Sequence, residues 1–406
     1  NNVAIGINSM FTNMSGSKNI AFGTESLFSN TQGDGNIAFG YQALKFNANG
    51  ENNIAFGDNV LSQNNGDKNI GMGVNSLKNN LIGHDNVGLG FHSLEKNTTG
   101  FNNVAIGPNA LINNTGGHNN IGFGTNALKN SNTSINNIAI GQNALVSSNT
   151  SNSKNNIAIG SETLRVNNNG INNIALGQDS LNKNIDGNNN VALGFQSMLN
   201  NLNGESNIAV GINALKMNTE GACNIAMGVD TLTNNITGKN NISLGFESMT
   251  NNTIGLNNNG YGIQSLHENI DGNNNVAIGP KSLYFNKGDN NIGIGFMTGA
   301  PAAEANDNKI INSISIGNQT NVDGTYSIAM GYKAKCLGSQ SIAIGYKATA
   351  TTDNTVVLGN TGSHTFIPGK DANGVPNISV NVNGNVVKLE DYINDLIDTA
   401  FIARGL

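Results

Sequence analysis

The chain has 406 residues, with 20 basic and 26 acidic side chains, a net charge of −6, 52 glycines and no tryptophan. Phosphate binding requires clustered Lys and Arg, and no basic stripe is present, so nucleic acid is not an expected partner. No run approaches the roughly 20 apolar residues of a membrane-spanning helix, so we do not expect this segment to insert into a membrane.

One phrase is repeated from the first residue to Gly295. Its clearest copy, residues 102–111, reads Asn-Asn-Val-Ala-Ile-Gly, two variable residues, a small residue and Leu. The glycines that close these phrases lie 17 residues apart, except for two steps of 16 and one of 19. Asn-rich chains can be disordered, but a disordered tract has no reason to keep apolar residues at fixed phase. A period this short indicates a solenoid with one coil per repeat.

We number the positions of a coil from this glycine. Positions −3 and −1 are large and apolar, whereas position −2 is Ala, Gly or Ser, and this alternation predicts a β-strand. Position +4 is Leu or Met in all copies but the last. We expect positions −3, −1 and +4 to form the core, which are Val104, Ile106 and Leu111 in the clearest copy. The small residue at −2, here Ala105, is expected to face either the opposite wall of a thin coil or another chain.

Position −4 is Asn in all eighteen copies. A surface Asn has no need of such regularity, so we predict that these amides hydrogen-bond from coil to coil as a ladder and satisfy backbone groups of the turns. The ladder includes Asn19, Asn36, Asn53, Asn103, Asn137, Asn173 and Asn241. One copy departs from the phrase, because Asn259 stands where the first apolar residue belongs.

Position +1 is the most variable, which predicts a coil corner outside the repeating core. Aromatic residues recur there, and they are our candidate surface-binding residues: Tyr41, Phe91, Phe195, Phe246, Phe296, Tyr332 and Tyr346. Aromatic side chains exposed in line form a stripe that suits a receptor or a glycan. The alternative is that they pack between the chains of an oligomer.

Spacing and composition divide the chain into five segments. A β-solenoid with 17-residue repeats spans 1–299, a junction loop spans 300–312, and 14-residue repeats span 313–360. The Ile-Ala-Ile-Gly strand survives in the shorter repeat, so both blocks are expected to share one stack. A neck with a β-hairpin around an Asn-Gly turn follows at 361–388. Residues 389–406 predict a short helix with a coiled-coil-like seam, which is marginal alone and suits association with copies of itself.

The phrase Ser-Ile-Ala-Ile-Gly-Tyr-Lys-Ala at 341–348 resembles the YadA-like head repeat of trimeric autotransporter adhesins. The 17-residue phrase is similar to longer variants of that head, which also occur in fibre proteins of phages and large viruses. Residues 354–360 are similar to head-to-stalk transitions of tail-fibre-like proteins. The resemblance implies a left-handed parallel β-roll, three chains side by side, and an extracellular attachment fibre on a cell or virion surface. Within these residues we expect neither the anchor barrel nor the long coiled-coil stalk of the adhesins, which is a departure from that family's pattern.

The repeats predict an all-β parallel solenoid, a rod about 105 Å long at roughly 4.8 Å per coil. The resemblance implies that this rod is a left-handed β-roll and works as a non-enzymatic homotrimer. Its receptor would be a cell-surface protein or a glycan. One alternative is a purely structural fibre or filament subunit without a ligand. A polysaccharide-degrading spike is another, but it needs paired carboxylates, whereas the acidic residues are scattered over many coils.

We expect no catalytic residue, cofactor or metal site. The five His lie in different coils, and neither a nucleophile elbow nor a phosphate-binding loop is present. Cys223 and Cys336 lie about 29 Å apart along the predicted axis. A disulfide requires Cα atoms within about 7 Å, so we expect two free thiols in the chain, with an interchain bridge as the minor alternative.

Overall fold

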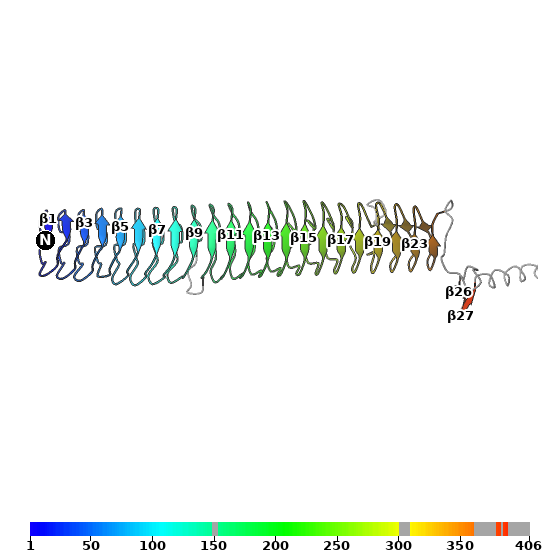
Figure 1. Ribbon diagram of the computed structural model, residues 1–406, viewed down its shortest axis with the longest axis horizontal. Helices are drawn as coiled ribbons and strands as arrows, with labels where there is room; N and C mark the ends of the chain where they lie inside the picture. Colours follow the sequence, from blue (N-terminus) through cyan, green and yellow to red (C-terminus); the bar gives the residue numbers. More distant parts are fainter. Residues whose placement is uncertain (148–152, 300–308, 361–378, 383–384, 389–406) are drawn as a thin grey trace, which may run out of the picture.

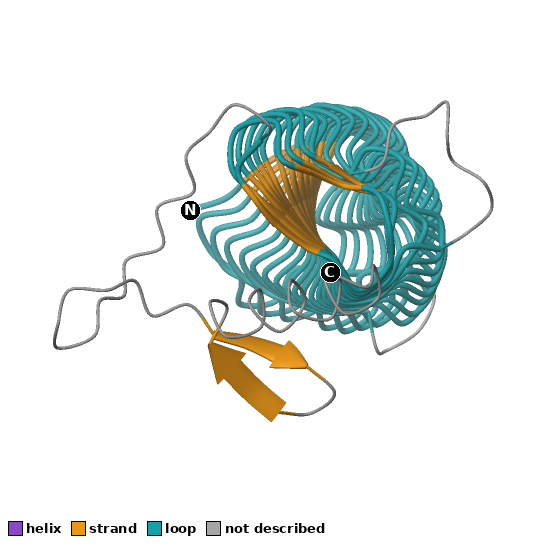
Figure 2. Ribbon diagram, turned by 90° about the vertical axis from the view of Figure 1, so that its right-hand side faces the viewer, coloured by secondary structure: helices purple, strands orange, loops and turns teal. Residues whose placement is uncertain are grey.

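The computed structural model describes residues 1–147, 153–299, 309–360, 379–382 and 385–388. One parallel sheet of 22 strands runs along the whole rod, with each strand paired to the strand of the next coil (Figure 1). Seen along the rod, the strands form one wall of the coil, and turns and loops close the rest of its circumference (Figure 2). The described residues contain no helix, and the predicted all-β parallel solenoid is confirmed.

Each 17-residue coil contributes one three-residue strand. These strands are β1 Val3–Ile5, β2 Ile20–Phe22, β3 Ile37–Phe39, β4 Ile54–Phe56, β5 Ile70–Met72, β6 Val87–Leu89, β7 Val104–Ile106, β8 Ile121–Phe123, β9 Ile138–Ile140, β10 Ile157–Ile159, β11 Ile174–Leu176, β12 Val191–Leu193, β13 Ile208–Val210, β14 Ile225–Met227, β15 Ile242–Leu244, β16 Asn259–Tyr261, β17 Val276–Ile278 and β18 Ile292–Ile294.

The 14-residue coils continue the same sheet with β19 Ile314–Ile316, β21 Ile328–Met330, β23 Ile342–Ile344 and β25 Val356–Leu358. A second, three-stranded sheet is formed by β20 Asn321–Val322, β22 Lys335–Cys336 and β24 Thr349–Ala350. Strand β18 pairs in register with β19, Ile292 opposite Ile314, so the expected single stack of both blocks is confirmed.

Register is kept whatever the length of the coil. A 16-residue step places Ile54 opposite Ile70, and the 19-residue step places Ile138 opposite Ile157. Additions and deletions therefore fall in the turns, and the strands keep their positions. Residues 148–152 of the longest coil lie outside the described residues.

The core lies on the other side of the strand from the one we expected. Ala105 is fully buried with Leu111, whereas Val104 and Ile106 are only half-buried and point outward. The assignment of positions −3 and −1 to the core was wrong, and only the +4 assignment was right. The small −2 residue faces the opposite wall of its own thin coil: a Cβ built on Gly122 lies 3.4 Å from Leu111 Cδ1.

This orientation also explains the departure at Asn259. Its side chain lies on the outer face of β16, where it pairs with Ile242 on one side and Val276 on the other. The inward residue of the same strand is Gly260, which is buried like its counterparts. A polar residue at −3 therefore leaves the interior of the coil unchanged.

Position +4 places a large side chain on a left-handed backbone. Leu111 has a φ of +53° and Leu164 of +48°, and both are fully buried. Such a conformation costs a non-glycine residue of order 1–3 kcal/mol, and burial of a leucine side chain contributes roughly 1.5–3 kcal/mol. The next coil holds the bend as well, because the Leu111 N–H donates to the Ala127 carbonyl at 2.9 Å.

The glycine that closes each strand is required by its backbone and by its neighbour. Gly107 has a φ of +124°, which L side chains rarely adopt. A Cβ at this position would also lie 2.8 Å from the carbonyl carbon of Gly124 in the next coil. The close approach of successive coils therefore explains why a glycine closes the strand in every repeat.

Near the C-terminus, β26 Ser379–Val382 pairs antiparallel with β27 Asn385–Lys388, as predicted for the hairpin. The remainder of the predicted neck and the predicted helix at 389–406 lie outside the described residues, as does most of the junction loop.

Candidate functional site

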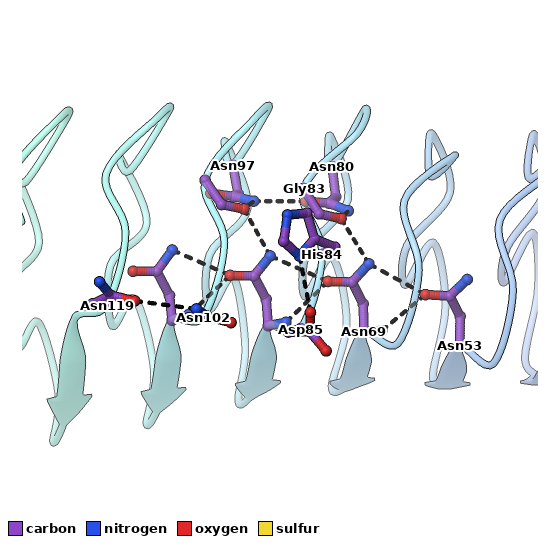
Figure 3. Close-up of polar contacts among 12 residues, drawn as sticks. Asn53, Asn69, Asn80, Gly83, His84, Asp85, Asn97, Asn102 and Asn119 are labelled. Carbon is purple, nitrogen blue, oxygen red and sulfur yellow. Dashed lines mark hydrogen bonds and ion pairs between the residues drawn. The ribbon is translucent and has the colours of Figure 1, made fainter.

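The predicted Asn positions lie inside the coil, where they form a continuous row of amides that we call the first ladder (Figure 3). Asn103 is typical: its backbone N–H and its Nδ2 both donate to Asn86 Oδ1, at 3.0 and 3.1 Å. Its Nδ2 also donates to the Gly117 carbonyl at 2.8 Å. The structure places all seven named residues in this ladder, each with its backbone N–H bonded to the preceding amide: Asn19, Asn36, Asn53, Asn103, Asn137, Asn173 and Asn241.

A second buried ladder, at position +7, was not predicted. Asn97 Nδ2 donates to Asn80 Oδ1 at 2.6 Å and to the Gly100 carbonyl at 2.9 Å (Figure 3). A Cβ on Gly100 would overlap Asn97 Oδ1, so the amide and the glycine three residues later require each other. Where Ser131 replaces the amide, Ser134 replaces the glycine, and both are buried. This paired change is the signal that reveals the ladder in the sequence.

The outward residues of the strands form a continuous apolar face along the rod, which we call the strand face. It consists of positions −3 and −1 from β1 to β25, and many of its side chains are more than a third exposed, from Phe22 at 48% to Leu358 at 41%. Aromatic members stack from coil to coil, with ring centroids of Phe39 and Phe56 4.8 Å apart. Soluble monomers rarely leave a contiguous apolar surface of this extent in water.

All seven candidate aromatics at position +1 are exposed, with fractions between 40% and 57%. The structure does not bring them together into one site. Tyr41 and Phe91 are separated from each other by coils that carry Asp58 and Val74 at this position. Seven consecutive coils instead carry an unbroken apolar column at +1: Phe195, Ile212, Val229, Phe246, Ile263, Pro280 and Phe296.

The last two candidates lie in adjacent coils and touch. Tyr332 and Tyr346 stack with ring centroids 5.5 Å apart and an interplanar angle of 12°. Each ring has the lysine of position +2 above it, with Lys333 Nζ 5.2 Å and Lys347 Nζ 5.0 Å from the respective centroids. We call these four residues the Tyr-Lys patch.

Several carboxylates at position +2 are held by amides of neighbouring coils. Asn143 Nδ2 donates to Glu162 Oε1 at 2.6 Å, and Gln264 Nε2 donates to Glu247 Oε2 at 2.6 Å. Glu25 accepts from Lys45 Nζ and from Gln42 Nε2, both at 2.8 Å, and the hydrogen bond from Lys45 is the main cause that lowers its pKa. No group of three or more His, Cys, Asp or Glu in the described residues is arranged to hold a metal ion.

The two cysteines are free thiols, Cys223 exposed and Cys336 buried. Burial raises the pKa of the Cys336 thiol. Within the described part of the chain, no helix has the length and hydrophobicity needed to cross a membrane.

The fold defines the chain as a parallel β-solenoid repeat protein. Residues 311–334 and 337–361 match the YadA head domain repeat, in two copies. These matches cover the 14-residue coils, from just before β19 to just after β25, and confirm the resemblance to YadA-like head repeats in that part of the chain. A search of curated proteins found no match. The head repeat and the solenoid fold together fit an adhesin-like fibre.

Proposed function

We propose that the protein is an extracellular attachment fibre, a rigid homotrimeric rod that binds a cell-surface protein or a glycan through its exposed corners and turns. The observation that carries this proposal is the strand face. It extends over all 22 strands of the main sheet, and an isolated chain would leave it in water. Three identical chains around a common axis bury three such faces against one another and close the assembly, so no chain leaves its strand face in water.

Association through this face is favoured by the geometry of the stack. Equivalent side chains lie in straight columns because the register is strict, as for Phe22, Phe39 and Phe56. The sheet satisfies its own backbone hydrogen bonds along the axis, so contact between chains rests on side chains. Burial of apolar surface stabilises by roughly 25 cal/mol per Å², and a face that runs the length of the rod offers a large area.

The head repeats at 311–361 support the same assembly, because YadA-like heads resemble this segment and work as trimers on surfaces. The proposed function is non-enzymatic. Described carboxylates at position +2, such as Glu162 and Glu247, are engaged by amides of the neighbouring coils.

Two measurements on the full chain test the proposal. Light scattering should give a particle of three times the 42.2 kDa chain mass, and the purified trimer should bind a cell or a glycan array saturably. A 42.2 kDa particle would overturn the trimer. A trimer that binds nothing on cells or glycans would instead indicate a purely structural fibre.

A further inference from the structure

Two adjacent coils present the Tyr-Lys patch in strict register. The Lys347 N–H donates to the Tyr332 carbonyl at 2.9 Å, so the backbone holds the second pair directly above the first. The tyrosines are 42% and 57% exposed. No hydrogen bond to either hydroxyl is found among the described residues. Four side chains on two rigid coils therefore form a preorganised surface that has no partner within the described part of the chain.

The charge of the patch is opposite to that of the rod. Neither lysine forms an ion pair with any described residue, whereas Lys45 is paired with Glu25 in the N-terminal part. The coil before the patch carries Asn318 and Gln319 at the same two positions, so no carboxylate adjoins it there. On a chain with a net charge of −6, this is a local excess of positive charge.

All the polar groups that the patch offers to solvent can donate hydrogen bonds. Because the two rings stack on each other, much of their electron-rich faces is covered, and ring edges and hydroxyls remain accessible. The edge of an aromatic ring is the positive part of its quadrupole. Ammonium and phenol groups both donate hydrogen bonds. The complementary ligand therefore presents oxygen acceptors and negative charge.

We infer that the Tyr-Lys patch binds an acidic polysaccharide through its carboxylate or sulfate groups, an inference that deepens the proposed attachment function and rests on it. A sugar chain lying along the axis meets one Tyr-Lys pair, and then the next roughly 4.8 Å further on. Its hydroxyls accept from the tyrosines while its anionic groups accept from the lysines. Single-stranded nucleic acid fits less well, because it is bound by stacking of bases on open aromatic faces, and here the two stacked rings cover much of each other's faces.

The test variant carries Tyr332→Asn, Lys333→Gln, Tyr346→Asn and Lys347→Gln, and it copies the Asn318-Gln319 pair of the preceding coil. Folding should be preserved, because Gln319 has a φ of +57° and both lysines have a φ of +54°. The matched control is Lys281→Gln. Lys281 is also at position +2 with a φ of +54°, and its Nζ lies 6.0 Å from the Tyr284 ring.

Binding of the full chain to heparin, to hyaluronan and to neutral dextran is measured by biolayer interferometry. We expect wild type to bind one or both acidic chains, not dextran, with an affinity that falls as salt rises. The fourfold variant should bind at least about tenfold more weakly, and Lys281→Gln should bind like wild type. Hyaluronan carries carboxylates alone and heparin carries sulfates as well, so binding to heparin without binding to hyaluronan identifies sulfate as the recognised group, and binding to hyaluronan shows that carboxylate suffices.

Equal binding by wild type and the fourfold variant would overturn the site. Tighter binding to single-stranded DNA or to a poly-glutamate peptide than to either polysaccharide would overturn the ligand class. Wild type that binds cells but neither acidic polysaccharide would overturn this inference and leave the attachment function standing. Wild type that binds neither cells nor glycans would overturn the proposed function itself.

Discussion

The side chain of Val60 occupies the space above Gly71 that an alanine Cβ fills in most other coils. A Cβ added to Gly71 would lie 2.5 Å from Val60 Cγ1. Val60 is at position +3, where other coils carry Ala, Ser or Thr, and Gly71 is at −2 of the next strand, where most carry Ala. The interior of a coil thus has a fixed volume, shared between its two walls.

Gly71→Ala should therefore destabilise the protein by about 1–3 kcal/mol through overpacking. The double variant Val60→Ala, Gly71→Ala restores the pair formed by Ala43 and Ala55 one coil earlier, and it should recover most of that loss. Chemical denaturation of wild type, the two single variants and the double variant gives the coupling energy between positions 60 and 71. Strictly additive effects would show that the two walls do not compete for the same space.

The first ladder can be tested by a substitution at the buried Asn103, with its exposed neighbour Asn102 as the matched control. Asn103→Ala removes the acceptor of the buried Asn120 N–H and of Asn120 Nδ2, in addition to its own donors. Each buried group left unsatisfied costs about 1–3 kcal/mol, so we expect a loss of about 3 kcal/mol or more. Thermal and denaturant unfolding measure it.

The control is Asn102→Lys, in the exposed row next to the ladder. Lys68 occupies the same coil position with a φ of +55°, against +54° for Asn102. We expect a change within about 0.5 kcal/mol of wild type. Equal losses for Asn102→Lys and Asn103→Ala would contradict the structural role assigned to the buried row.

The proposal that the strand face forms the contact between chains can be tested by placing charges on it in three consecutive coils. Ile106→Asp, Phe123→Asp and Ile140→Asp put carboxylates on the outer face, where the coil tolerates polar residues but an interchain contact does not. Analytical ultracentrifugation should show at least about tenfold weaker association, with a circular dichroism spectrum like that of wild type.

A charge-matched control moves the same three carboxylates to position +2, as Asn109→Asp, Asn126→Asp and Asn143→Asp. Asp179 and Asp230 occupy this position naturally with φ values of +57° and +54°. The control should stay trimeric. A strand-face variant that is as trimeric as the control would place the contact between chains elsewhere, for example on the +1 column.

We expect Glu25 to make the stability of the folded chain depend on pH, and the sign of this dependence follows from its lowered pKa. Hydrogen bonds from Lys45 and then Gln42 stabilise the carboxylate in the folded chain, so its folded pKa lies below the ordinary 4.5. This contribution to stability is present above pH 4.5 and is lost as the pH falls through the folded pKa.

The comparison is between wild type and Glu25→Gln, since Gln42 occupies the same position in the next coil with a φ of +56°. Between pH 5 and pH 3, the melting temperature of wild type should fall further than that of the variant. Parallel melting curves would mean that the Lys45–Glu25 contact is lost in solution.

The sequence was sufficient to predict the solenoid and its strands, because 17-residue spacing leaves little choice of architecture. It was not sufficient to decide which side of each strand is inside. Period-two alternation defines two faces equally well, and we assigned the larger residues, Val104 and Ile106, to the core. The opposite assignment holds because Leu111 already fills the narrow coil and leaves room only for a small residue opposite, at Gly122 of the next strand.

The candidate surface was predicted only in part. Variability correctly indicated an exposed corner at position +1. The sequence could not show that Lys333 lies over the Tyr332 ring, because the direction of a side chain at a bend depends on the left-handed conformation of position +2. The second ladder is hard to predict for a related reason: Asn97 resembles an ordinary turn residue, and only the paired change at Ser131 and Ser134 marks the row in the sequence.

Register survives steps of 16, 17 and 19 residues, because the strand and the glycine are fixed while the turns absorb the difference. A gene that encodes such a chain can therefore gain or lose whole repeats by tandem duplication or deletion without a new core having to evolve. Each added repeat would extend the reach of the fibre by roughly 4.8 Å. If the chain is the attachment fibre proposed above, the distance between its carrier and the contacted surface becomes a quantity that selection can adjust in small, equal increments.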